Sequence, residues 1–168
     1  MITVTNYIKH WEGLRLKLYR CPTGKLTIGY GRNIQNNPLT KDEYEMLFPD
    51  FTWLEAAVEL YGNGITEAGA SKLLKDYLIT QSRDLVINYG WFRILNNERK
   101  IVVLDMIYNL GFAGFMGFRK MLKALKRSDY EKAGDEIRNS KYYIQVGERA
   151  EVNAYIIDTG HFPNSLGL

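Results

Sequence analysis

The spacing of apolar residues changes near residue 13, and this change limits the chain to a small sheet in a mostly helical fold. Residues 3–12 carry apolar side chains at helical spacing. Residues 14–20 instead alternate, with leucine at 14, 16 and 18, which predicts a half-buried strand. The run Cys-Pro-Thr-Gly at 21–24 is a turn signal, and residues 25–31 read as a second strand. The sequence therefore predicts one β-hairpin, formed early in the chain.

The rest of the chain is expected to be helical. A loop rich in asparagine at 33–38 leads to a capping box in which Thr40 and Glu43 cap each other's backbone amides. Residues 51–61 form an amphipathic helix, and a long helix runs from about 67 to 88. Shorter helices are expected near 90–95, 98–111, 113–117, 119–127, 130–139, 141–145 and 147–158. The predicted fold class is α+β, mainly α.

These elements suggest a single domain over residues 1–168 with two lobes. The N-terminal lobe covers about 12–66 and contains the hairpin, and the long helix at about 67–88 links it to a larger helical lobe. The helical lobe covers about 89–168 and includes the first helix, 3–12. Clefts between lobes are common places for a site.

Composition excludes several classes of protein. Cys21 is the only cysteine and there are two histidines, so we expect neither an intramolecular disulfide nor a metal site. No apolar run approaches the roughly 20 residues of a membrane span, and the N-terminus does not read as a signal peptide. The net charge of +3 is too small to indicate nucleic-acid binding. We expect a protein made in a cytoplasm, without cofactor or stable membrane association.

The hairpin region carries the most specific motif. Residues 12–19 read Glu-Gly-Leu-Arg-Leu-Lys-Leu-Tyr and residues 27–31 read Thr-Ile-Gly-Tyr-Gly. This resembles the signature of the phage-type lysozymes, glycoside hydrolase family 24, whose site follows the spacing Glu, eight residues, Asp or Cys, five residues, Thr. Glu12, Cys21 and Thr27 match that spacing without a gap. Residues 106–118 and 140–150 match more weakly, and residues 33–64 align poorly.

The resemblance implies a lysozyme-like fold that cleaves the β-1,4 bond between N-acetylmuramic acid and N-acetylglucosamine in peptidoglycan. Cleavage needs a proton on the leaving oxygen, and Glu12 is the expected general acid. The resemblance also implies that Glu12 is partly removed from water, which favours its protonated form. Arg149 would hydrogen-bond Glu12 and fix its rotamer.

Cys21 stands where the commoner form of the family has a second carboxylate. A free thiol has a pKa of about 8.5, so only a few per cent would be thiolate at pH 7, and a nearby Glu12 anion would lower that fraction. Three roles are open: a general base, a covalent nucleophile, or a group that orients water together with Thr27. We favour a base or water-positioning role with inversion at the anomeric carbon.

The same resemblance suggests substrate contacts from residues along both lobes. These residues are Gly31, Asn33, Tyr108, Asn109 and Phe118. The expected partner is the glycan strand of peptidoglycan. The protein is expected to be a monomeric endolysin that depends on a phage holin for its release. Two other functions are open: a lytic transglycosylase, which needs only one catalytic acid, and an inactive wall-binding module.

Overall fold

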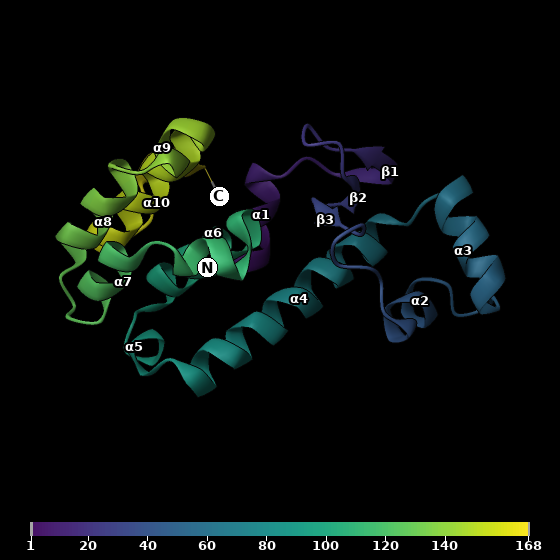
Figure 1. The fold of residues 1–168 in the computed structure, drawn as a ribbon, viewed down its shortest axis with the longest axis horizontal. Helices are drawn as coiled ribbons and strands as arrows, with labels where there is room; N and C mark the ends of the chain where they lie inside the picture. Colours follow the sequence, from purple (N-terminus) through teal and green to yellow (C-terminus); the bar gives the residue numbers. More distant parts are fainter. Residues whose placement is uncertain (1, 168) are drawn as a thin grey trace. The chain divides into compact units, whose positions relative to one another are not determined.

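The computed structural model describes residues 2–167 and separates into two compact units. The sheet unit is the continuous segment Ile8–Ile79. The helical unit combines the segment up to Tyr7 with the segment from Thr80 onward. Helices α1 (Val4–Trp11) and α4 (Glu67–Asn88) run from one unit into the other (Figure 1). The model confirms the expected class, a mainly helical α+β fold with one small sheet.

The sheet has three antiparallel strands in the order β1 (Arg15–Arg20), β2 (Leu26–Gly29) and β3 (Arg32–Asn33). The hairpin of β1 and β2 is confirmed. Strand β3 occupies residues that we expected to lead directly into a loop, and it pairs Arg32 with Ile28 and Asn33 with Thr27. Two residues are too short a strand to produce a periodic signal in the sequence.

The prediction of a regularly half-buried first strand is wrong. Leu14 and Leu16 are 37% and 39% exposed, whereas the successive residues Leu18 and Tyr19 are both half-buried. The pairing register of β1 shifts between Arg15 and Tyr19. Such an irregularity breaks the alternation of faces, so the leucine spacing does not report burial here.

Two short helices follow the sheet, and each begins with a capping box. The predicted box of α2 (Lys41–Leu47) is confirmed, because Thr40 accepts from the Glu43 amide and Glu43 accepts from the Thr40 amide. Helix α3 (Trp53–Gly62) has the same arrangement at Thr52, and it packs against β1. Each box satisfies two backbone amides that have no partner within the helix.

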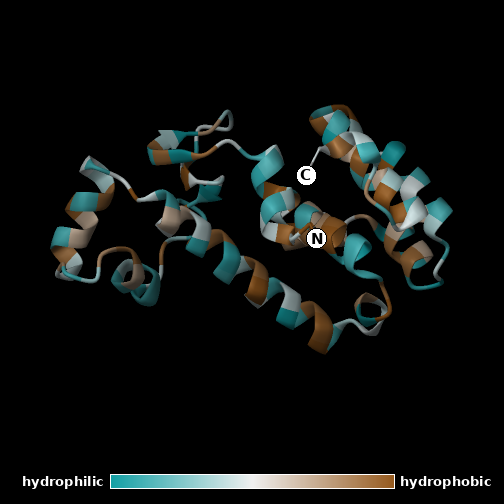
Figure 2. Cartoon of the chain, turned by 180° about the vertical axis from the view of Figure 1, so that it is seen from behind, coloured by the Kyte–Doolittle hydropathy of each residue, from teal (hydrophilic) through white to brown (hydrophobic). Residues whose placement is uncertain are grey.

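Helix α4 begins after Thr66, whose hydroxyl accepts from the Gly69 amide at 3.0 Å. Hydrophobic positions recur along it turn by turn (Figure 2), and Leu73, Leu74 and Leu78 are buried within the sheet unit. This periodic apolar face explains why its extent could be predicted from the sequence.

The helical unit is built around helix α10, which packs against α6, α8 and α9. Its elements are α5 (Gly90–Arg93), α6 (Asn97–Met116), α7 (Arg119–Leu125), α8 (Tyr130–Arg138), α9 (Lys141–Val146), α10 (Glu148–Thr159) and the 3-10 turn η1 (Asn164–Leu166). Helix α6 is kinked at Gly111, with φ 74°. The kink is at the last residue of the helix expected at 98–111, just before the one expected at 113–117.

A polar network lies inside the helical unit. Asp105 is fully buried, and Arg149 donates to both of its carboxylate oxygens, from Nη2 at 2.8 Å and from Nε at 3.2 Å. The Asn153 side-chain amide also donates to Asp105, at 2.8 Å, and to the Tyr142 hydroxyl at 3.1 Å. Tyr7 donates its hydroxyl to Asn153 at 2.7 Å. The network joins α1, α6, α9 and α10.

Among residues 2–167, no single helix is long and apolar enough to cross a membrane. Helices α6 and α7 together meet the length and composition of a span, but they are bent by 103° at their junction.

Candidate active site

Glu12 lies at the end of α1 and is half-buried. Its amide donates to the Ile8 carbonyl at 3.0 Å, so its backbone continues the last turn of the helix. Gly13 follows, and the chain then enters β1. The last hydrogen-bonded turn of α1 therefore fixes the backbone position from which the Glu12 side chain extends.

The hairpin places Tyr19, Cys21 and Thr27 on one face of the sheet. Tyr19 lies directly opposite Thr27 in the antiparallel register. Cys21 comes two residues after Tyr19, and its amide extends the strand pairing by donating to the Lys25 carbonyl at 3.0 Å. Side chains that face each other across strands, or that lie two apart along one strand, share a face.

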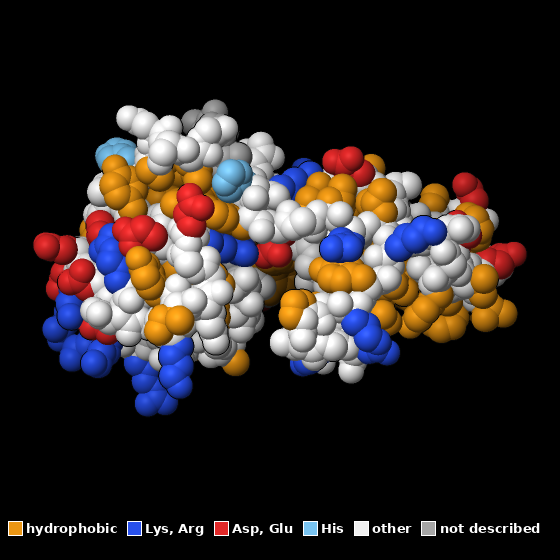
Figure 3. Space-filling view, turned by 90° about the horizontal axis from the view of Figure 1, so that it is seen from above, with side chains coloured by type: hydrophobic (Ala, Val, Ile, Leu, Met, Phe, Trp, Pro, Cys, Tyr) orange, Lys and Arg blue, Asp and Glu red, His pale blue; other side chains and the backbone are white. Residues whose placement is uncertain are grey.

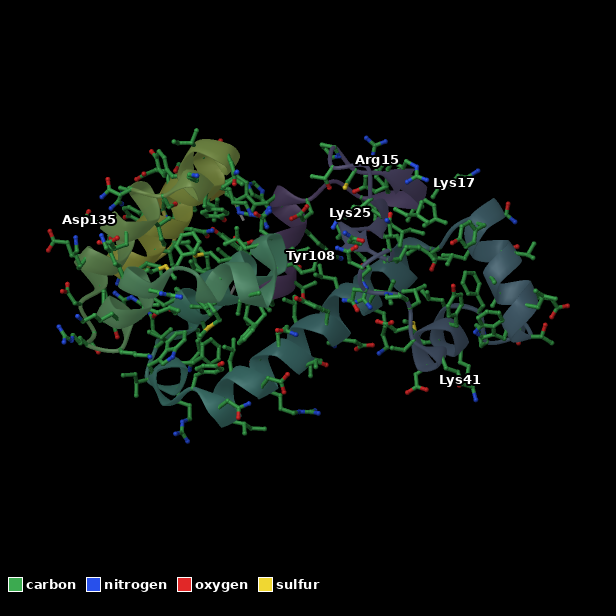
Figure 4. All side chains as sticks on the ribbon, in the orientation of Figure 1. Arg15, Lys17, Lys25, Lys41, Tyr108 and Asp135 are labelled. Atoms are coloured by element: carbon green, nitrogen blue, oxygen red, sulfur yellow. The ribbon has the colours of Figure 1, made fainter. Side chains whose placement is uncertain are left out.

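The phenol of Tyr19 connects this face to Glu12. Burial raises the pKa of Tyr19, and the negative charges of Glu12 and Cys21 raise it further, while Arg15 lowers it. The Arg15 guanidinium lies 5.3 Å from the centre of the Tyr19 ring. Arg15 and the neighbouring cations Lys17 and Lys25 all project from the hairpin (Figure 4). Glu12 and Cys21 therefore act electrostatically on one phenol that sequence reasoning did not single out.

Cys21 ionises far more readily than we expected from the sequence. The hydroxyl of Thr23 lies 3.1 Å from Sγ, and its hydrogen bond is the main reason that the thiol pKa falls to about 7. Partial burial opposes this shift, while hydrogen bonds from the backbone of Lys25 and Thr23 and from Thr27 support it. This lowered pKa differs from the ordinary thiol value on which the expectation of a few per cent thiolate rests.

The turn between the strands determines where Thr23 lies. The Gly24 amide donates to the Cys21 carbonyl at 2.7 Å, and Gly24 has φ +80°, a conformation that glycine adopts without strain. Arg20 donates from Nη1 to the Gly24 carbonyl at 2.8 Å and braces the loop. This four-residue turn folds the Thr23 hydroxyl back toward Cys21.

Thr27 is buried, with 3% of its surface exposed. Its hydroxyl donates to the Lys25 carbonyl at 2.9 Å. A hydroxyl has one proton and two lone pairs. With the proton directed at Lys25 the oxygen offers its lone pairs as acceptors, and with the proton directed at Cys21 the hydroxyl makes the smallest of the contributions that lower the thiol pKa.

Two further predicted residues follow Thr27 in the sheet unit. Gly31 has φ +89° and is half-buried. The side-chain oxygen of Asn33 accepts from the amides of Gln35 at 3.1 Å and Asn36 at 3.0 Å. That oxygen therefore has a structural role in the loop, which the sequence did not predict.

The other predicted site residues belong to the helical unit. Tyr108, half-buried, and Asn109, exposed, lie on α6 (Figure 4 labels Tyr108). Phe118 precedes α7, packs edge-on against Tyr142 at 6.1 Å, and lines a pocket of about 610 Å³. Arg149 is 6% exposed and belongs to the buried network described above. The structure gives the positions of these residues, and their contacts with the glycan strand or with Glu12 stay predictions.

Within residues 2–167, no group of three or more His, Cys, Asp or Glu side chains is arranged to hold a metal ion.

Comparison with known proteins establishes the family. The model of the family described as phage lysozyme matches residues 9–151, most of the chain. The chain belongs to the phage lysozyme family. Lysozymes of this family degrade peptidoglycan, and the match includes Glu12, Cys21 and Thr27. The resemblance seen in the sequence is thereby confirmed.

The relatives of this phage lysozyme differ in size. It is 30% identical over 166 residues to the pre-baseplate central spike protein of Enterobacteria phage T4, covering 95% of this chain but only 28% of the spike protein. It is 24% identical to the probable T4-type lysozyme 2 of Dictyostelium discoideum, covering 94% of this chain and 95% of that protein. An endolysin of Acyrthosiphon pisum secondary endosymbiont phage 1 is 26% identical over 129 residues, which is 77% of this chain and 70% of the endolysin.

Proposed function

We propose that this lysozyme hydrolyses the β-1,4 bond between N-acetylmuramic acid and N-acetylglucosamine, with Glu12 as general acid and Cys21 as general base. The observation that carries the proposal is the position of the Cys21 sulfur, 3.1 Å from the Thr23 hydroxyl and on the same face of the sheet as Thr27, a geometry that lowers the thiol pKa to about 7. A base that is half ionised near neutral pH is well matched to accepting a proton from water.

In the proposed reaction, protonated Glu12 gives its proton to the glycosidic oxygen as the bond to the anomeric carbon breaks. A water molecule attacks that carbon from the opposite side and loses one proton to the Cys21 thiolate. The second hydrogen atom of that water forms a hydrogen bond to the Thr27 oxygen. The lone pairs of this oxygen are available because the Thr27 hydroxyl donates its proton to the Lys25 carbonyl. The products are two shorter glycan strands, and Glu12 and Cys21 then exchange protons with solvent.

Thr23 completes this proposal as a positioning residue that acts through Cys21. By donating to the sulfur, its hydroxyl stabilises the thiolate relative to the thiol. A carboxylate at this position would be ionised at neutral pH without such help. Thr23 thus compensates for the replacement of a carboxylate by a thiol.

Alkylation of Cys21 with iodoacetamide, followed across pH, tests the role of Thr23 directly. Because Cys21 is the only cysteine, the rate reports on this thiol alone. We expect a midpoint near pH 7 in the wild type and in Thr23→Ser, and a shift toward the unperturbed value of about 8.5 in Thr23→Val. An unchanged midpoint in Thr23→Val would contradict this role even if the enzyme is active.

Digestion of purified peptidoglycan tests the reaction. We expect products that have gained one water and an inverted anomer in the first-formed reducing end, followed by NMR. Glu12→Gln and Cys21→Ser should each lose about 10²–10⁴-fold in rate, whereas Cys21→Asp should remain active. Products without added water would indicate a transglycosylase, and a retained anomer would indicate that Cys21 is a nucleophile. A wild type that releases no products would indicate an inactive wall-binding module.

The remaining assignments extend the same proposal. We propose that Gly31, Asn33, Tyr108, Asn109 and Phe118 contact the glycan strand. Orientation of the Glu12 carboxyl by Arg149 stays a prediction of the family resemblance. As an endolysin, the protein would reach the wall through a pore formed by a phage holin.

A further inference from the structure

Helix α7 and the turn that follows it carry the net positive charge of this chain. Residues 119–127 contain five Lys or Arg residues and no Asp or Glu. Subtracting these five from the 22 basic residues of the chain leaves 17, against 19 acidic residues, so the net charge outside this segment is −2. Lys and Arg side chains gather along one edge of the helical unit (Figure 3). We call the five cations, Arg119, Lys120, Lys123, Lys126 and Arg127, the α7 strip.

The α7 strip forms one face of its helix. At about 3.6 residues per turn, the five positions fall within an arc of about 120° around the helix axis. All five residues are exposed. Lys126 keeps helical backbone angles, and the Arg127 amide donates to the Ala124 carbonyl at 2.9 Å, so both continue the path of the helix. The other side of α7 lies in the core, where at most 6% of each side chain is exposed at Met121, Leu122, Ala124 and Leu125.

The stability of α7 does not account for the strip. Cations in the first turn of a helix are unfavourable, because the N-terminal end is the positive end of the helix dipole. Helix α7 nevertheless begins with Arg119 and Lys120, and Phe118 before them provides no side-chain cap. Helices α2, α3 and α8 each have a side-chain cap and an acidic residue in the first turn. Among residues 2–167, no ion pair includes a cation of the strip, so these charges are available to a partner.

We propose that the α7 strip binds acidic groups of peptidoglycan and forms a second contact with the wall, in addition to the hairpin site. Peptidoglycan is a polyanion, because the lactyl group of each muramic acid ends in a carboxyl group or in a peptide that carries carboxylates. A face with five cations is complementary to such a polymer. This contact requires only that peptidoglycan is the substrate, as it is for the family, and it does not depend on the roles proposed for Glu12 and Cys21.

Three observations favour the wall over other polyanions. A helix that binds an anionic membrane also inserts apolar side chains, and those of α7 are already buried in the core. Proteins that bind single-stranded nucleic acid combine cations with aromatic side chains that stack on the bases, and residues 119–127 contain no aromatic residue. Arg119 and Lys120 line the pocket of about 610 Å³ beside Phe118, which we propose contacts the glycan strand. The strip is therefore continuous with a proposed substrate contact.

Sedimentation of the full chain with purified peptidoglycan tests the proposal. Every protein carries Glu12→Gln, so that cleavage does not consume the wall, and the bound fraction is measured against the amount of wall. An exposed ion pair contributes up to about fivefold to a binding constant. Lys123→Glu with Lys126→Glu removes two such contacts and reverses both charges, so the affinity should fall by at least about fivefold. Raising the salt from about 0.1 M to about 1 M should release the same part of the binding, because the Debye length shortens from about 10 Å to about 3 Å.

Lys75→Glu with Arg83→Glu is the matched control, because both residues are exposed on α4 and the two double substitutions lower the net charge by the same amount. The control should bind the wall like its Glu12→Gln parent, and circular dichroism should show every variant folded. Lys123→Gln with Lys126→Gln removes the charges without reversing them and should lose a smaller part of the affinity.

Unchanged binding to peptidoglycan in Lys123→Glu with Lys126→Glu would overturn the proposal, whether or not its binding to vesicles of anionic lipid falls. Equal loss of binding in this variant and in the α4 control would also overturn it, because net charge alone would then explain the result. Release of soluble glycan by Glu12→Gln would instead contradict the proposed reaction and leave the second contact supported by the difference between the two double variants.

Discussion

Replacing Asp105 with alanine is expected to destabilise the protein by about 3–5 kcal/mol, the usual cost of removing one member of a buried ion pair. Asp105 is fully buried, and both of its carboxylate oxygens accept from the guanidinium of Arg149, which is itself 6% exposed. The substitution also leaves without an acceptor the Asn153 amide hydrogen that points at Asp105. For a chain of this length, the loss corresponds to a fall in Tm of about 10 °C.

Thermal denaturation followed by circular dichroism measures this loss. The informative control is the pair Asp105→Leu with Arg149→Met, which removes both charges and fills the space with apolar side chains. Replacing a buried ion pair in this way is often neutral, so the pair should cost at least about 2 kcal/mol less than Asp105→Ala alone. If Asp105→Ala costs under about 1 kcal/mol, or the paired variant is equally unstable, the reasoning about the buried Asp105–Arg149 ion pair is refuted.

Three further predictions concern other parts of the chain. Lytic activity should fall as the pH drops through about 7, because protonation of the Cys21 thiolate removes the base. In Cys21→Asp this fall should occur two or more pH units lower, near the carboxyl pKa of about 4. Profiles of rate against pH measure both. Gly134→Ala should cost about 1–3 kcal/mol in thermal denaturation, since a Cβ there would collide with the Asp158 carboxylate held by Arg138. Thr52→Ala removes the cap of α3 and should cost about 1 kcal/mol, measured by urea unfolding.

Much of the fold could be predicted because its signals are local. The capping box at Thr40 depends on residues three apart, and the kink at Gly111 depends on a residue that adopts positive φ freely. Strand β3 and the exposure of Leu16 could not be read in the same way. Both depend on pairing between distant strands, in which one irregular register changes which face a side chain occupies.

The candidate site likewise has features that the local sequence predicts and features that depend on the folded geometry. The spacing of Glu12, Cys21 and Thr27 is a property of the sequence, whereas the ionisation of Cys21 depends on a hydroxyl 3.1 Å from its sulfur. That distance follows from the geometry of the turn, which the sequence does not specify in atomic detail. The burial of Asp105 did leave a signal that we missed, because it interrupts an otherwise apolar run at 101–107. An acidic residue in such a run needs a buried partner.

One unit is formed by a single segment of the chain and the other by two separate segments, and this difference has a consequence for biosynthesis. The sheet unit is one continuous segment, so all of it has left the ribosome before most of the helical unit is made. The helical unit instead needs its first residues, since Tyr7 donates to Asn153 near the other end of the chain. At about 5–20 residues per second, that N-terminal segment waits for at least several seconds of translation before its partner emerges. The proposed hairpin site can therefore form early, while closure of the buried polar network must wait until Asn153 has been made.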